Sequence, residues 1–103
     1  MKLLIVTAIH ECKEAVAHIF HETGLHKYSV IDIHGVNNIH AGNMLDNWFA
    51  SPGTDDFNEA VMMFCFTEDA AARKTLAALK QYNIDNCNDF PVRALLMPVE
   101  ESI

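Results

Sequence analysis

Two short apolar runs constrain the fold of this chain more than any other feature. Leu3–Ile9 (LLIVTAI) and Ala60–Phe66 (AVMMFCF) contain almost no polar residue at either set of alternating positions. A strand that faces water on one side alternates polar and apolar side chains, whereas a strand covered on both sides does not. We therefore predict two buried strands in a sheet whose second face needs a cover of its own.

The remaining segments complete an alternating plan. Residues 11–23 carry apolar side chains at helical spacing, and Gly24 follows where a left-handed helix C-cap is expected. Tyr28–Ile33 is typical of a second strand, Thr67 can cap a second helix, and Val92–Val99 is typical of a fourth strand. The plan predicts an α+β fold, a ferredoxin-like β-α-β-β-α-β sandwich.

The size and charge of the chain limit its partners. Its 103 residues suit a single domain spanning residues 1–103, and half of them are hydrophobic. Seven basic against fourteen acidic residues give a net charge of −7, which argues against a nucleic-acid partner. No apolar run approaches the roughly 20 residues of a membrane span, so we expect no membrane insertion. Three cysteines without a CxxC motif favour a reducing, cytoplasmic setting.

A long polar loop, Gly35–Glu59 (residues 35–59), lies between the second and third predicted strands. Loops beyond about 12–15 residues are uncommon in compact domains and are often functional. Met44, Trp48 and Phe49 within it are candidate anchors for a partner protein, because large apolar side chains dominate protein recognition. The alternatives are that the aromatic pair folds back on its own oligomer, or that the insertion has no role.

Histidines gather near one edge of the predicted sheet. The first two strands run parallel in this plan, so their carboxyl ends share an edge, which brings together His10, His34 and His40. Imidazole ligands suit zinc, copper or nickel, so a transition-metal site is a candidate there, with Cys87 and Asp89 nearby. The alternative is that each histidine is an ordinary polar residue of a strand end or loop.

The chain resembles a known family in several of these segments. Gly24 ends the first helix, Ser29–Gly35 (SVIDIHG) closes a strand on a glycine before the long loop, and Val61–Thr67 leads into a helix. This pattern resembles the PII family of trimeric nitrogen-regulatory signal-transduction proteins and, more loosely, the CutA family. The resemblance implies a homotrimer and a T-loop-like segment at residues 35–59.

The resemblance also implies where a ligand would bind, and where this chain departs from the family. A cleft between subunits beside Gly35 would use Gly35, Asn37, Asn38 and Arg93 as candidate ligand-binding residues. The family holds phosphates with a glycine-rich basic loop before its last strand, but Asn83–Pro91 (NIDNCNDFP), predicted here as a turn-rich connection, has no glycine and two aspartates. Carboxylates repel phosphate, so we do not expect this chain to bind ATP. We expect a metal ion or a small anion as the ligand instead.

Three functions follow in order of preference. The first is a non-enzymatic PII-like regulator whose loop docks on a target protein, such as a membrane transporter or efflux component, in response to a small ligand or metal ion. The second is a metal-binding, CutA-like tolerance or homeostasis protein. The third is a small oligomeric ferredoxin-fold enzyme, which rests on fold analogy alone. No Ser-His-Asp spacing, P-loop or GxGxxG motif supports catalytic residues.

Overall fold

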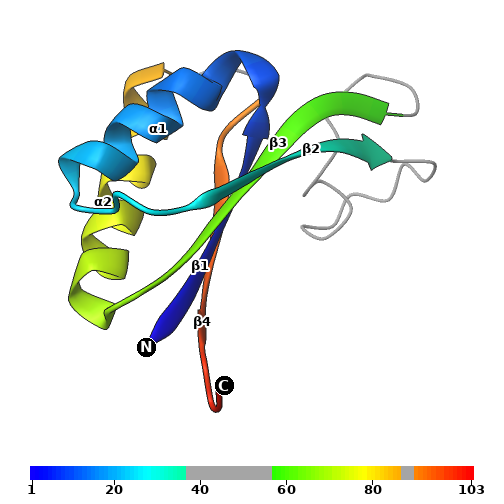
Figure 1. Ribbon diagram of the computed structural model, residues 1–103. Helices are drawn as coiled ribbons and strands as arrows, with labels where there is room; N and C mark the ends of the chain where they lie inside the picture. The colour runs from blue at the N-terminus through cyan, green and yellow to red at the C-terminus, as the bar shows by residue number, and fades with distance from the viewer. Residues whose placement is uncertain (37–56, 87–89) are drawn as a thin grey trace.

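The computed structural model describes residues 1–36, 57–86 and 90–103 (Figure 1). The described elements are β1 (Lys2–Ile9), a short 3-10 helix η1 (His10–Cys12), α1 (Lys13–Glu22), β2 (Ser29–Val36), β3 (Phe57–Thr67), α2 (Asp69–Asn86) and β4 (Arg93–Pro98). The described strands form one antiparallel sheet in the order β2-β3-β1-β4, and both helices lie on the same face of it. The predicted order of strands and helices is confirmed.

The core lies between the helices and the inner face of the sheet. Alternate residues of β1 and β3 face inward in register: Leu4 opposite Cys65, Val6 opposite Met63 and Ala8 opposite Val61. Val16 and Phe20 of α1 and Ala72 of α2 pack with no exposed surface. Burying a side chain such as Phe20 stabilises the fold by about 1.5–3 kcal/mol, so this face holds the helices to the sheet.

The end of α1 follows the predicted glycine cap. Gly24 has a φ of +91°, the left-handed region that glycine enters at little cost. Its N–H donates to the carbonyl of His21 (3.2 Å), and the N–H of Leu25 donates to the carbonyl of Phe20 (2.8 Å). These bonds satisfy carbonyls that the last turn of a helix leaves open. Leu25 is buried, so the turn also packs against the core.

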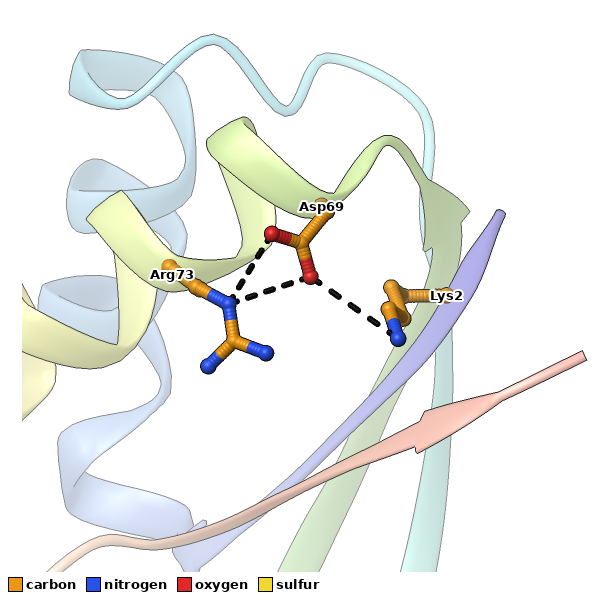
Figure 2. A network of polar contacts seen from close by, with 3 residues as sticks. All are labelled: Lys2, Asp69 and Arg73. Atoms are coloured by element: carbon orange, nitrogen blue, oxygen red, sulfur yellow. Dashed lines mark hydrogen bonds and ion pairs between the residues drawn. The ribbon is translucent and has the colours of Figure 1, made fainter.

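The start of α2 is held by charge, and the predicted Thr67 cap is wrong. Thr67 is the last residue of β3 and pairs with Lys2, so its backbone belongs to the sheet. Asp69 begins the helix instead. Its carboxylate accepts from Arg73 Nε (2.9 and 3.1 Å) and lies 3.8 Å from Lys2 Nζ (Figure 2). A carboxylate in the first turn also interacts favourably with the helix dipole.

The second helix is longer than predicted. The sequence pattern predicts a turn-rich connection over residues 83–91, but α2 continues to Asn86. The amide of Asn83 donates to the carbonyl of Val92 (2.9 Å) and accepts from the N–H of Val92 (2.9 Å). A side chain that usually favours turns is used here to join the end of α2 to the residue before β4.

The outer face of the sheet is apolar, and neither α1 nor α2 covers it. Ile31, Phe66, Leu95 and Met97 lie on it, and Phe66 keeps 57% of its surface exposed. The helices cover only the opposite face (Figure 1). We predicted that the second face of the sheet needs a cover, and this face is apolar as that prediction requires. Large contiguous apolar patches mark interaction sites.

The strand residues on either side of the long loop form a projecting hairpin. β1 pairs with β3 only as far as Ile9 opposite Ala60, but β2 and β3 continue to pair for three further residues. We call residues 34–36 with residues 57–59 the hairpin arm; it extends about 10 Å beyond β1 and is visible in Figure 1. The loop predicted at 35–59 is thus too long at both ends, because Gly35 pairs with Asn58 inside the ladder.

Candidate functional site

Several of the predicted site residues lie at one end of the sheet, which we call the loop end. His10 follows the last residue of β1, and His34 and Gly35 lie near the last residue of β2. Arg93 begins β4 opposite Thr7, close to the end of β1. Strands β1 and β2 each run antiparallel to β3, so they are parallel to each other and finish at the same end.

His10 and His34 lie at the same end of the sheet, as predicted, and the metal site proposed there remains a prediction. Ile9 and Ile33 both pair with Ala60, so β3 lies between β1, which His10 follows, and β2, which carries His34. Two strand spacings separate those backbones by about 10 Å. Glu59 pairs with His34 between them. Among the described residues, no three His, Cys, Asp or Glu side chains are placed to hold one ion. His40 lies outside the described residues, as do Cys87 and Asp89.

The candidate ligand residues are on opposite edges of the sheet. Gly35 belongs to β2 and Arg93 to β4, and these are the first and last strands in the order β2-β3-β1-β4. Three strand spacings amount to about 14–15 Å, too far for both residues to contact one small ligand within one chain. Asn37 and Asn38 lie outside the described residues. A ligand site that joins Gly35 to Arg93 therefore requires two copies of the chain.

The candidate partner-binding residues cannot be placed, but their point of attachment can. Met44, Trp48 and Phe49 lie outside the described residues. The chain leaves the described structure after Val36 and returns at Phe57, and these two residues pair at the tip of the hairpin arm. Residues 37–56 are therefore attached at both ends to two paired strands that extend beyond the end of β1.

A partly buried cysteine–tyrosine contact was missed by sequence reasoning. The hydroxyl of Tyr82 on α2 donates to Cys12 Sγ at 3.7 Å. This hydrogen bond is the main cause that raises the pKa of Tyr82, and burial of the hydroxyl is the second cause. Burial likewise raises the pKa of the Cys65 thiol. Cys12 and Cys65 are both buried and pack as small side chains of the core.

Within residues 1–36, 57–86 and 90–103, no helix is both long and apolar enough to cross a bilayer. The longest described helix, α2, carries charged residues along its length and packs on the sheet.

Comparison with solved structures gives the fold of PII-like signalling proteins. The chain is similar to a DUF3240 family protein from Shewanella baltica, with 19% identity, a TM-score of 0.66 and coverage of 98% of this chain and 91% of that chain. It is similar to a PII-like signalling protein from Thermus thermophilus, with 13% identity, a TM-score of 0.64 and coverage of 95% and 85%. The resemblance inferred from the sequence is thus confirmed at the level of the fold.

A third similar structure comes with bound molecules. It is CPII from Thiomonas intermedia, solved with ADP, AMP and acetate, with 12% identity, a TM-score of 0.59 and coverage of 97% of this chain and 88% of that chain. No protein-family model and no curated protein matches this sequence. At these identities the likeness establishes the fold and leaves the ligand and the target to other arguments.

Proposed function

We propose that this chain is a non-enzymatic regulatory protein of the PII-like kind, in which residues 37–56 dock on a target protein when a small ligand binds. The observation that carries this proposal is the hairpin arm. Its last pair, Val36 opposite Phe57, holds the segment beyond the end of β1. A recognition segment on a paired two-stranded base loses less orientational freedom on binding than one on a free loop.

The ligand cleft in this proposal lies between copies of a homotrimer. The apolar outer face, with Phe66 and Leu95 exposed, supports packing of sheet against sheet. Gly35 and Arg93 occupy opposite edges of one sheet, which supports a site that takes one residue from each of two copies. A ligand in that cleft contacts the base of the hairpin arm and so can change the order of the attached segment.

The ligand in this proposal is a metal ion or a small anion rather than ATP. Arg93 is the last basic residue in the chain, and the segment before β4 carries Asp85 and Asp89 without a glycine. One guanidinium can bind a carboxylate or a single phosphate group in a bidentate manner. It cannot balance the charge of a triphosphate beside two carboxylates.

Site-specific crosslinking tests the docking role. A photo-reactive amino acid replaces Trp48 in the full chain expressed in its own cell, and a matched control carries it at Lys74, which is exposed on α2. We expect position 48 to crosslink one membrane transporter or efflux component that position 74 does not capture. Crosslinks from position 48 to this chain alone would contradict the proposal, since they would show that the aromatic pair packs on its own oligomer.

A metal-binding role of the CutA-like kind is the second candidate, favoured by His10 and His34 at the same end of the sheet. In this second role the two histidines and His40 from neighbouring copies bind one transition-metal ion. A His34→Ala, His40→Ala double variant should then lose most of its affinity for Zn²⁺ in calorimetry. Full retention of affinity would exclude the site.

A further inference from the structure

Two exposed histidines are in ring contact across the turn that ends α1. His21 lies in the last turn of the helix and His26 lies two residues after Gly24. Their ring centroids are 5.0 Å apart with an interplanar angle of 71°. Both side chains are exposed. The contact is therefore open to a ligand from solvent.

The backbone between the two histidines is fixed. Gly24 adopts a φ of +91°, and its N–H donates to the carbonyl of His21 itself (3.2 Å). Thr23 and Leu25 on either side of Gly24 are buried. His21 lies in α1 and His26 directly follows the buried Leu25, so the packed turn keeps the two imidazoles close to each other. Such pre-organisation lowers the cost of binding an ion between them.

The ring separation matches that of two imidazoles bound to one metal ion. A zinc–nitrogen bond of about 2.0–2.1 Å puts each ring centre about 3.2 Å from the ion, so two rings lie about 5.2 Å apart at a tetrahedral angle and about 4.5 Å apart at a right angle. The observed 5.0 Å falls between these values. Exposed side chains can turn between staggered rotamers to direct their nitrogens at the ion.

The charge around the pair also suits a cation. His21 lies at the carboxyl end of α1, where the helix dipole is negative. The whole chain carries a net charge of −7. The neighbouring His18 does not share the ring contact; its Nε2 lies 3.5 Å from Glu22 instead.

We propose that His21 and His26 together bind one divalent transition-metal ion, with water in the remaining coordination positions. Neutral imidazole is the commonest protein ligand for copper, nickel and zinc, and affinity should follow Zn²⁺ and Ni²⁺ below Cu²⁺. This site lies at the end of the sheet away from His10 and His34, because α1 runs back from the loop end (Figure 1). It is independent of the regulatory role proposed above.

Nickel binding to the tag-free full chain tests the site. A background variant with His10, His34 and His40 each replaced by glutamine removes the other candidate metal site, so the two proposals can fail separately. In this background we expect calorimetry to show one Ni²⁺ per chain. Either His21→Gln or His26→Gln should weaken binding about tenfold or more, because losing one of two linked ligands removes the effective concentration of the other.

His18→Gln is the matched control, since His18 is exposed one turn earlier on the same helix. It should leave the affinity unchanged. In amide NMR spectra, paramagnetic Ni²⁺ should broaden Thr23, Gly24 and Leu25 first. The proposal is overturned if His21→Gln or His26→Gln binds Ni²⁺ as tightly as the background, if His18→Gln causes the same loss, or if broadening centres elsewhere.

Discussion

The hydroxyl of Thr23 lies 2.7 Å from the hydroxyl of Thr75, and this buried contact joins the end of α1 to the middle of α2. Each oxygen also approaches a carbonyl of its own helix, Thr23 that of Ile19 at 2.8 Å and Thr75 that of Ala71 at 2.9 Å. The two hydroxyl protons are thus shared among these acceptors. The pair satisfies polar atoms inside the helix layer and sets how the two helices align.

Replacing Thr75 by valine should therefore destabilise the protein without creating a cavity. Thr75→Val keeps the shape of the side chain but removes one hydrogen-bonding partner of Thr23, which costs about 1–2 kcal/mol in the free energy of unfolding. Urea denaturation measures the change. Lys74→Ala, exposed on the same helix, should stay within about 0.5 kcal/mol of the wild type. Equal stability of Thr75→Val and the wild type would show that the contact is dispensable.

Alkaline pH should destabilise the protein through Cys65. Burial raises the pKa of this thiol in the folded state. The unfolded chain then loses the proton first as pH rises, so the stabilisation is complete below about pH 8.5, the ordinary pKa of a thiol, and is lost progressively above it. Tyr82 acts in the same direction at higher pH, because its pKa is also raised.

The Cys65→Val variant isolates this effect. We expect the free energy of unfolding to fall less steeply between about pH 8 and pH 10 in Cys65→Val than in the wild type, whatever its absolute stability. Chemical denaturation at a series of pH values measures the two slopes. Parallel slopes would mean that the Cys65 thiol titrates alike in the folded and unfolded chains.

The outer face of the sheet should control self-association. Leu95 is 44% exposed on this face, so Leu95→Lys places an ammonium group where a second copy would pack. Burying an unpaired charge costs several kcal/mol, and we expect association to weaken at least about a hundredfold. Light scattering after size-exclusion chromatography measures the mass. Ala77→Lys, exposed on α2, should keep the wild-type mass. A monomeric wild type would contradict the homotrimer.

Nucleotide titration should separate this chain from nucleotide-binding structures of the same fold. We expect ATP and ADP to bind no more tightly than about 1 mM in calorimetry. The physical reason is that residues 83–91 contain no glycine or lysine to hold a phosphate and include the carboxylate of Asp85, which repels it. Micromolar binding that disappears in Arg93→Ala would show that the phosphates are held by a geometry other than a glycine-rich loop.

The element order and the inner face of the fold followed from hydrophobic periodicity. The apolar runs predict β1 and β3 as buried strands, and their inner residues pair in register as Val6 opposite Met63. Gly24 is predicted as a helix cap because only glycine enters its backbone conformation without strain, and its φ of +91° agrees. These features are local or depend on a simple period, which is why one sequence suffices to predict them.

The boundaries that sequence reasoning missed depend on distant partners. The pattern predicts that a loop starts at Gly35, but the pairing of Gly35 with Asn58 continues the ladder. It also predicts a turn at Asn83, but the side chain of Asn83 binds the backbone of Val92 and α2 continues past it. Glycine and asparagine favour turns in isolation. Tertiary hydrogen bonds reverse that preference in both places.

The candidate site is predicted less completely than the fold. The shared position of His10 and His34 at one end followed from parallel strands, but the placement of Gly35 and Arg93 on opposite edges depends on the strand order. The contact of His21 with His26 was not anticipated. Their separation in the sequence is not a ligand spacing on a helix, and only the turn at Gly24 brings the rings together.

The length of the hairpin arm is independent of the strand pairing that forms the core. β1 stops pairing at Ala60, so residues 57–59 and their partners 34–36 lie outside the central ladder of β1 with β3. Removing one residue from each strand there would shorten the reach while leaving the fold intact. Because strand side chains alternate in direction, it would also turn everything beyond the deletion to the opposite side. The reach of the arm and the side toward which it faces are therefore set by the number of residues beyond Ala60, separately from the ladder of β1 with β3.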